Sequence, residues 1–166
     1  MRYIDIPYFG IIDPFSVEEE YSGGLELRNV EVMLDLNFEA QWIRPDRLQA
    51  VKDMLDKITA IDDKNRQLLR EQYMDPALHK VRYYLEFLQE KIWRSALEVL
   101  VDFSNQSAPP REQMLNSMHL VRAGFYPDLE NGFAVFDYSI GYDYTEYVLT
   151  LSLNANGELQ EITTEM

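Results

Sequence analysis

The clearest structural signal in the chain is the run Val30-Glu31-Val32-Met33-Leu34-Asp35-Leu36-Asn37-Phe38-Glu39. Its apolar side chains recur at every second position, the repeat of a β-strand that buries one face and leaves the other in water. Residues Ser22-Gly23-Gly24 before this run predict a hairpin turn, with residues 17–21 as a shorter partner strand. The N-terminal part of the chain is therefore predicted to form antiparallel strands.

The same two-residue repeat returns near the C-terminus, where Tyr147, Leu149, Leu151 and Leu153 occupy alternate positions. Residues 154–157, Asn-Ala-Asn-Gly, accept the positive φ of a tight turn and predict a hairpin that returns through residues 159–164. The runs 118–126 and 133–140 flank a turn at residues 127–132 and predict a second hairpin. Four further strands are expected from this part of the chain.

The middle of the chain has a helical repeat instead. Residues 45–58 start with a proline and carry apolar side chains three and four positions apart, as one face of a helix requires. Asp62 and Asp63 predict the cap of a second helix. Pro76 opens a third, whose apolar stripe runs to Ile92 and can continue toward Phe103, before the loop at residues 104–110.

The order of strands, helices and strands predicts an α+β fold rather than βαβ crossovers. We expect one domain, residues 1–166, with an antiparallel sheet built from the N-terminal and C-terminal strands. A central block of about three helices would pack on one face of this sheet, because the last strands have no covering helices of their own. The other face would lie in water.

Charge divides along the chain in the same way as the predicted elements. The net charge is −14; residues 1–39 and 109–166 each carry nine acidic and two basic side chains, whereas residues 40–108 carry eleven of each. The water-facing side and rim of the sheet are therefore predicted to be acidic. This balance argues against nucleic acid and anionic membranes as partners and favours a basic protein. The alternative is that the acidic surface only maintains solubility.

Composition also bears on the compartment. The chain has no cysteine, which excludes disulfides and thiolate chemistry and fits a reducing environment. Its apolar stretches are too short to span a membrane, and its first residues lack the pattern of an export signal. We expect a cytoplasmic, soluble protein, and the sequence leaves its oligomeric state open.

The sequence contains little that indicates catalysis. The histidines are His79 and His119, and neither belongs to a metal-binding pattern. No nucleophile elbow, phosphate-binding glycine loop or dinucleotide motif is present, so we expect no cofactor, no metal and no catalytic residue that can be named. Carboxylates are abundant, and an enzyme or small-ligand-binding protein that uses carboxylates alone stays as the alternative to a noncatalytic function.

Arg122 and Asp137 are predicted to form a structural pair. Asp137 falls in an otherwise apolar and aromatic run, and a hairpin turn centred near residues 129 and 130 places Arg122 directly opposite it on one face. We interpret the two side chains as a cross-strand ion pair that stabilises the sheet.

The segment 137–147 contains four tyrosines and three acidic residues around a predicted turn at Gly141. Tyrosine is enriched at the centres of protein interfaces, and acidic groups steer basic partners. The hypothesis is therefore a partner-binding surface formed by Tyr142, Asp143, Tyr144 and Glu146 together with Glu31 and Asp35. The alternative is that these are ordinary strand tyrosines, half buried with the hydroxyl in water.

Four runs carry a resemblance to a known family: Leu34-Asp35-Leu36-Asn37-Phe38, Gly124-Phe125-Tyr126-Pro127-Asp128, Phe133-Ala134-Val135-Phe136-Asp137-Tyr138-Ser139-Ile140 and Asn156-Gly157-Glu158-Leu159. They resemble a bacterial family catalogued only as a domain of unknown function, over nearly the whole chain. The resemblance implies a fold and no catalytic residues. In size, charge and architecture the chain also resembles immunity proteins of bacterial toxin systems. The favoured function is thus a noncatalytic protein-binding module, with an immunity-type inhibitor of a basic toxin as its specific form.

Overall fold

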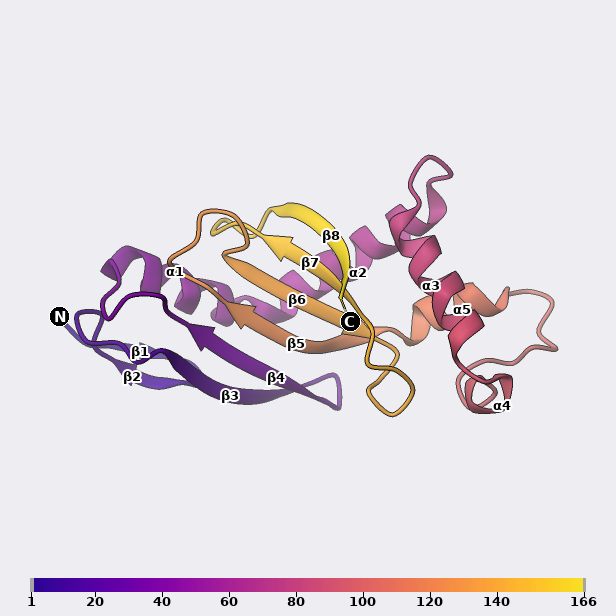
Figure 1. Ribbon diagram of the computed structural model, residues 1–166, viewed down its shortest axis with the longest axis horizontal. Coiled ribbons are helices and arrows are strands. Elements are labelled where there is room, and N and C mark those ends of the chain that lie inside the picture. Colours follow the sequence, from indigo (N-terminus) through magenta and orange to yellow (C-terminus); the bar gives the residue numbers. More distant parts are fainter. Residues whose placement is uncertain (1, 166) are drawn as a thin grey trace.

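A six-stranded sheet dominates the computed structural model, which describes residues 2–165 (Figure 1). The strands lie side by side in the order of the sequence: β3 (Glu20–Leu27), β4 (Val30–Asn37), β5 (His119–Phe125), β6 (Ala134–Ser139), β7 (Val148–Leu153) and β8 (Leu159–Glu165). A separate small hairpin precedes them, formed by β1 (Ile4–Ile6) and β2 (Gly10–Ile12). The predicted α+β class, with a sheet built from both ends of the chain, is confirmed.

Five helical segments connect β4 to β5: α1 (Pro45–Asp56), α2 (Ile58–Met74), α3 (Lys80–Lys91), α4 (Arg94–Leu97) and α5 (Pro110–Ser117). Helices α1 and α2 run along the back of the sheet, whereas α3, α4 and α5 gather beyond one end of it (Figure 1). The front of the sheet has no helix over it in this view. The layered arrangement predicted from the sequence is therefore present, although α3 and the two shorter helices lie at the end of the sheet.

One hydrophobic core joins the strands to the helices. Leu36 of β4 and Leu151 of β7 are fully buried, as the alternating patterns predict, and they belong to the same cluster as Leu48 and Leu55 of α1. Leu88 of α3 joins this cluster too. The C-terminal strands thus bury their apolar side against the central helices.

The hairpin of β3 and β4 differs from the prediction in the position of its turn. The two strands pair without interruption from Glu20 opposite Asn37 to Leu27 opposite Val30, so the two adjacent glycines lie inside β3. The turn is Arg28–Asn29, with φ of 54° and 65°. A two-residue hairpin turn with positive φ at both positions matches the twist of the strands. Ion pairs of Arg28 with Asp62 and Asp63 hold the side chain of the strained arginine.

Three helix boundaries differ from the prediction. Helix α2 begins at Ile58, so Asp62 and Asp63 lie inside it and do not cap it. The third helix begins at Lys80 rather than at Pro76, and it ends at Lys91 rather than continuing toward Phe103. The chain reverses there and forms α4, and α5 follows the predicted loop, with Pro110 in its first turn. Capping patterns identify candidate helix starts, but tertiary packing determines which of them is used.

The sheet also contains one parallel pair. Strands β4 and β5 run in the same direction, with Met33 opposite Arg122 and Asp35 opposite Gly124, and every other neighbouring pair in the sheet is antiparallel. A parallel pair requires a long crossover connection, and the helical segments α1–α5 provide it. No such crossover was predicted from the sequence, because the order of strands, helices and strands favoured antiparallel pairing. The parallel pair joins the N-terminal strands β3 and β4 to the C-terminal strands β5–β8 within one sheet.

Candidate functional site

The open face of the sheet is strongly acidic. Residues that lie opposite one another share a face, so the pairing of the strands shows which side chains point away from α1 and α2. In the described part of the chain, the strand residues on this open face include one arginine and no lysine, against seven carboxylates: Glu20, Glu26, Glu31, Asp35, Asp137, Glu161 and Glu165. The charge distribution along the sequence predicts this acidic face.

Arg122 lies at the centre of this face and joins three strands. Its Nε and Nη2 donate to the two carboxylate oxygens of Asp35 on β4, both at 2.8 Å. Its Nη1 donates to Asp137 Oδ2 on β6 at 3.1 Å. The predicted register of Arg122 and Asp137 is confirmed, because the two residues are direct cross-strand partners. Asp35 is the stronger partner of Arg122, since it accepts two parallel hydrogen bonds in the fork geometry that favours arginine.

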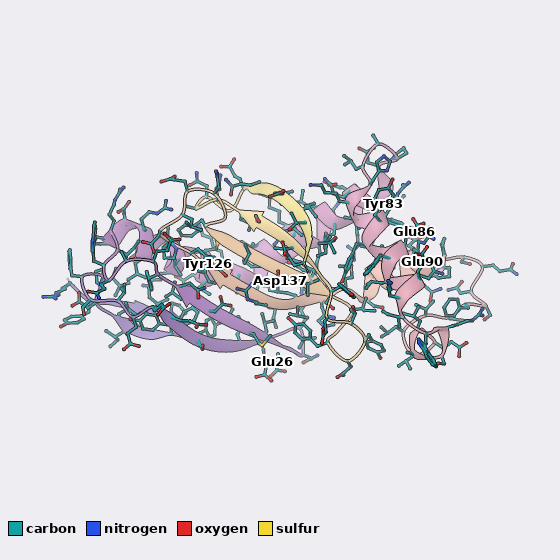
Figure 2. All side chains as sticks on the ribbon, in the orientation of Figure 1. Glu26, Tyr83, Glu86, Glu90, Tyr126 and Asp137 are labelled. Carbon is teal, nitrogen blue, oxygen red and sulfur yellow. The ribbon has the colours of Figure 1, made fainter. Side chains whose placement is uncertain are left out.

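Neutral side chains complete the cluster around Arg122. Tyr126 Oη accepts from Arg122 Nη2 at 2.8 Å, and Thr150 Oγ1 donates to Asp137 Oδ1 at 2.6 Å. Asn37 Nδ2 donates to Asp35 Oδ2 at 2.7 Å. Figure 2 shows Tyr126 and Asp137 over the middle strands. These contacts satisfy both carboxylates from more than one side, so the cluster is a connected polar network.

Gly124 makes room for this network. A Cβ on Gly124 would lie 2.5 Å from Arg122 Nη2 and 3.0 Å from Asp35 Oδ2. The guanidinium therefore lies flat over the backbone of its own strand, where it can reach β4. Glycine is required because another side chain would occupy the space of the ion pair.

The electrostatics of Arg122 follow from these contacts. Burial disfavours its charge, but the hydrogen bonds and the charge of Asp35, together with the Tyr126 hydroxyl, outweigh burial and raise the pKa of Arg122. The exposed fractions of the side chains are 27% for Arg122, 16% for Asp35 and 9% for Asp137. The charge of Arg122 is therefore paired with Asp35 and Asp137. Among the described strand residues of the open face, no other arginine and no lysine is present to pair with the remaining carboxylates.

A shallow hollow of about 430 Å³ adjoins the cluster on the side of β3. Ser22, Met33, Asn37 and Tyr126 contribute to its walls, along with Asp35 and Arg122. Met33 is 51% exposed and contributes an apolar side chain to the hollow. The hollow combines an apolar spot with a polar rim and is open to solvent.

The tyrosine-rich segment follows β6 and forms a turn with Gly141 at φ 127°. Tyr142 is 49% exposed, whereas Tyr144 packs partly against the core. Asp143 and Glu146 are exposed. Partial burial raises the pKa of Tyr142, and the charge of Asp137 adds to this effect while Arg122 opposes it. Tyr142 is the more exposed of the two tyrosines in this turn.

The six residues of the partner-binding hypothesis have different environments. Glu31 is exposed and lies opposite Glu26 near the tip of the β3–β4 hairpin. Asp35 is not a free acidic group, because it is bound to Arg122. The parallel pairing of β4 with β5 creates this contact between residues 87 positions apart, and no local pattern could have revealed it. Thr150 was also missed, although its place opposite Asp137 follows from the hairpin turn near Gly141.

Three side chains of α3 lie on a stripe that was not predicted from the sequence. Figure 2 shows Tyr83, Glu86 and Glu90 spaced along this helix at the end of the sheet. Tyr83 and Glu90 are exposed, and Glu86 is half-buried. The helical spacing of three and four residues places them on one stripe. The positions could have been identified from the side of α3 opposite its apolar stripe.

A second ionic network lies on the buried side of the sheet. Asp62 of α2 is fully buried, accepts a 2.7 Å hydrogen bond from the Tyr138 hydroxyl and pairs with Arg28 and Arg66, both at 3.0 Å. Arg66 also donates to the carbonyl of Met118 at 3.3 Å. The network ties the β3–β4 turn, α2 and β6 together, so its contacts are those of a structural element.

The polar centre of the open face is already hydrogen-bonded within the protein. Asp35 and Asp137, its most buried carboxylates, are occupied by Arg122, Asn37 and Thr150. Within residues 2–165, no three histidine or carboxylate side chains converge in a way that could hold a metal ion. None of the described helices is both long and apolar enough to cross a membrane.

Comparison with family models, curated proteins and solved structures finds no match to this chain. The resemblance to a bacterial family of unknown function stays a prediction.

Proposed function

We propose that this chain is a noncatalytic protein-binding module that takes a basic protein on the open face of its sheet. An immunity-type inhibitor of a basic toxin domain is the specific form of this proposal. The observation that carries it is the imbalance of charge on that face, seven carboxylates against one arginine whose charge is already paired. A basic protein would neutralise the unpaired carboxylates, and the same field repels nucleic acid.

Two kinds of contact support this binding mode. Carboxylates at the ends of the strands, such as Glu31 and Glu161, are exposed and act at long range on an approaching partner. Tyr142 is partly exposed on the segment that follows β6 and offers the large, semi-polar surface of an interface anchor. The absence of cysteine fits the proposed cytoplasmic location.

The decisive experiment identifies a basic partner by capture from the native host and measures its binding to purified variants. Replacing Glu31 and Glu161 by lysine should slow association at least about ten-fold at low salt, and the effect should shrink at 0.5 M salt, because exposed charges are screened. Tyr142→Ala should raise the dissociation rate, with a loss of about 2 kcal/mol if Tyr142 is a hot spot.

The matched control is Asp53→Lys, an equal change of charge at an exposed position of α1 on the other side of the sheet. It should leave association nearly unchanged. A partner that binds the Glu31/Glu161 double variant as fast as the native chain, or the Asp53 variant as slowly as the double variant, would rule out the open face as the binding surface.

A further inference from the structure

Strand β3 forms one edge of the sheet and has neither the bulge nor the proline that often protects an edge, although Glu20 and Glu26 give it charge. It pairs with β4 alone, over eight consecutive residues, Glu20–Leu27, without a bulge. It contains no proline and no lysine, the residues that commonly block further pairing. The opposite edge strand, β8, pairs with β7 through an irregular register near Leu153. An extended segment could therefore continue the sheet more regularly at β3.

The side chains of β3 on the open face follow a simple pattern. Glu20 and Glu26 stand at its two ends, and Ser22 and Gly24 lie between them. Gly24 has no side chain to cover its cross-strand neighbour Met33, which is exposed beside the hollow of about 430 Å³. The loop between β1 and β2 reaches Gly23 from the helix side, where the Tyr8 carbonyl would lie 2.7 Å from an added Cβ, so it does not cover the open face.

Charge determines which occupant fits this edge. A second copy of the chain, paired antiparallel about Gly23, would place Glu20 of each copy opposite Glu26 of the other. Like charges directly opposite each other are destabilising, so self-association at β3 is disfavoured. A segment with basic side chains at the same two positions would be stabilised instead. The two glutamates are six positions apart, a distance of about 20 Å along an extended chain.

We propose that an extended basic segment of the partner adds to β3 as a seventh strand. Its lysine or arginine side chains pair with Glu20 and Glu26, and apolar or aromatic side chains at the two alternate positions between them pack over Ser22, Gly24 and Met33. The recognised sequence thus alternates as basic, any, apolar, any, apolar, any, basic. The inference rests on the proposed function and specifies how the partner is bound: backbone hydrogen bonds give affinity, and side chains on one face give specificity.

The experiment uses a synthetic peptide, Lys-Thr-Tyr-Thr-Val-Thr-Lys, with both termini blocked, and the full chain at low salt. Two further peptides have the same sequence with N-methyl groups on alternate backbone amides. One carries them at the odd-numbered positions and the other at the even-numbered positions. Methylation on one register should weaken binding at least about ten-fold, because it removes the amide donors that face β3. Exchange of the backbone amides of residues 20–27 should slow when the unmodified peptide is bound.

Charge variants test the side-chain part of the proposal. Glu26→Lys should weaken binding of the unmodified peptide at least about ten-fold, whereas Asp53→Lys, an equal change at an exposed position of α1 on the other side of the sheet, should have little effect. A circular dichroism spectrum of each variant checks that it is folded. A peptide of the same composition with its two lysines adjacent in the centre should bind more weakly than the original.

The outcomes separate this inference from the proposed function. Equal binding of the original and both methylated peptides overturns strand addition and leaves a basic partner on the open face in place. The same holds if the peptides fail to bind while a captured basic protein still responds to the Glu31/Glu161 reversal. A partner that ignores that reversal overturns the proposed function itself. Dimerisation that Glu26→Lys alters would show that a second copy occupies the edge, and it would also overturn the inference.

Discussion

Replacing Gly124 by alanine should destabilise the protein, although the same change in an ordinary strand is neutral or favourable. The added Cβ would lie 2.5 Å from Arg122 Nη2, well inside van der Waals contact. Arginine side chains are usually free to move away, but here four hydrogen bonds to Asp35, Asp137 and Tyr126 hold the guanidinium. The side chain can therefore move only by breaking part of the central network.

The expected magnitude follows from the contacts that must break. The two hydrogen bonds to Asp35 are charge-assisted and only partly exposed, and such bonds contribute about 1.5–3 kcal/mol each in favourable cases. Loss of backbone freedom in the unfolded chain offsets this by about 0.4–1 kcal/mol. We expect a net loss of about 2 kcal/mol, which corresponds to a fall in Tm of about 4–8 °C for a chain of this size.

Urea unfolding followed by circular dichroism measures this loss, with Gly24→Ala as the matched control. Gly24 also lies in a strand on the open face, but a Cβ there would meet the Val32 carbonyl at an ordinary 3.5 Å. The control variant should be as stable as the native chain or slightly more stable.

A double-mutant cycle with Arg122→Met tests the cause. If contact with the guanidinium is responsible, Gly124→Ala should cost much less in the Arg122→Met background than in the native one. Equal stability of Gly124→Ala and the native chain, or an unchanged cost when Arg122 is absent, would refute the close packing of Arg122 over Gly124.

Two further predictions concern the buried side of the sheet. Asp62→Ala should lower the free energy of unfolding by about 3 kcal/mol, because it leaves the Tyr138 hydroxyl and two arginines without their carboxylate. Asp63→Ala removes an exposed partner of the same Arg28 and should cost less than about 1 kcal/mol. Equal losses for the two variants in urea unfolding would contradict this prediction. Burial raises the pKa of the Tyr84 and Tyr138 hydroxyls, so the unfolded chain loses these protons first, and the contribution of these two hydroxyls to stability should be constant below about pH 10 and decrease above it. Tyr84→Phe should make this alkaline decrease shallower in urea titrations between about pH 9 and 11.5, and an unchanged slope would show that Tyr84 ionises as freely in the folded chain as in the unfolded one.

The local sequence was sufficient to predict those features that depend on near neighbours in the chain. The alternation around Leu34 and Leu36 defined β4 and its buried face, because a strand repeats every two residues whatever it packs against. The opposition of Arg122 and Asp137 could be predicted because a short turn fixes the register of a hairpin. The acidic character of the open face followed from the concentration of carboxylates in the strand-forming parts of the chain.

Contacts between distant segments were decided only by the tertiary structure. Asp35 meets Arg122 because α1–α5 return the chain to the start of β5, which makes β5 parallel to β4 and brings Gly124 opposite Asp35. A turn at Arg28–Asn29 has no strong local signal, and its arginine is held by Asp62, a residue of α2. Local patterns carry the repeat of an element and the geometry of a short turn, whereas the partner of each strand depends on how the whole core is buried.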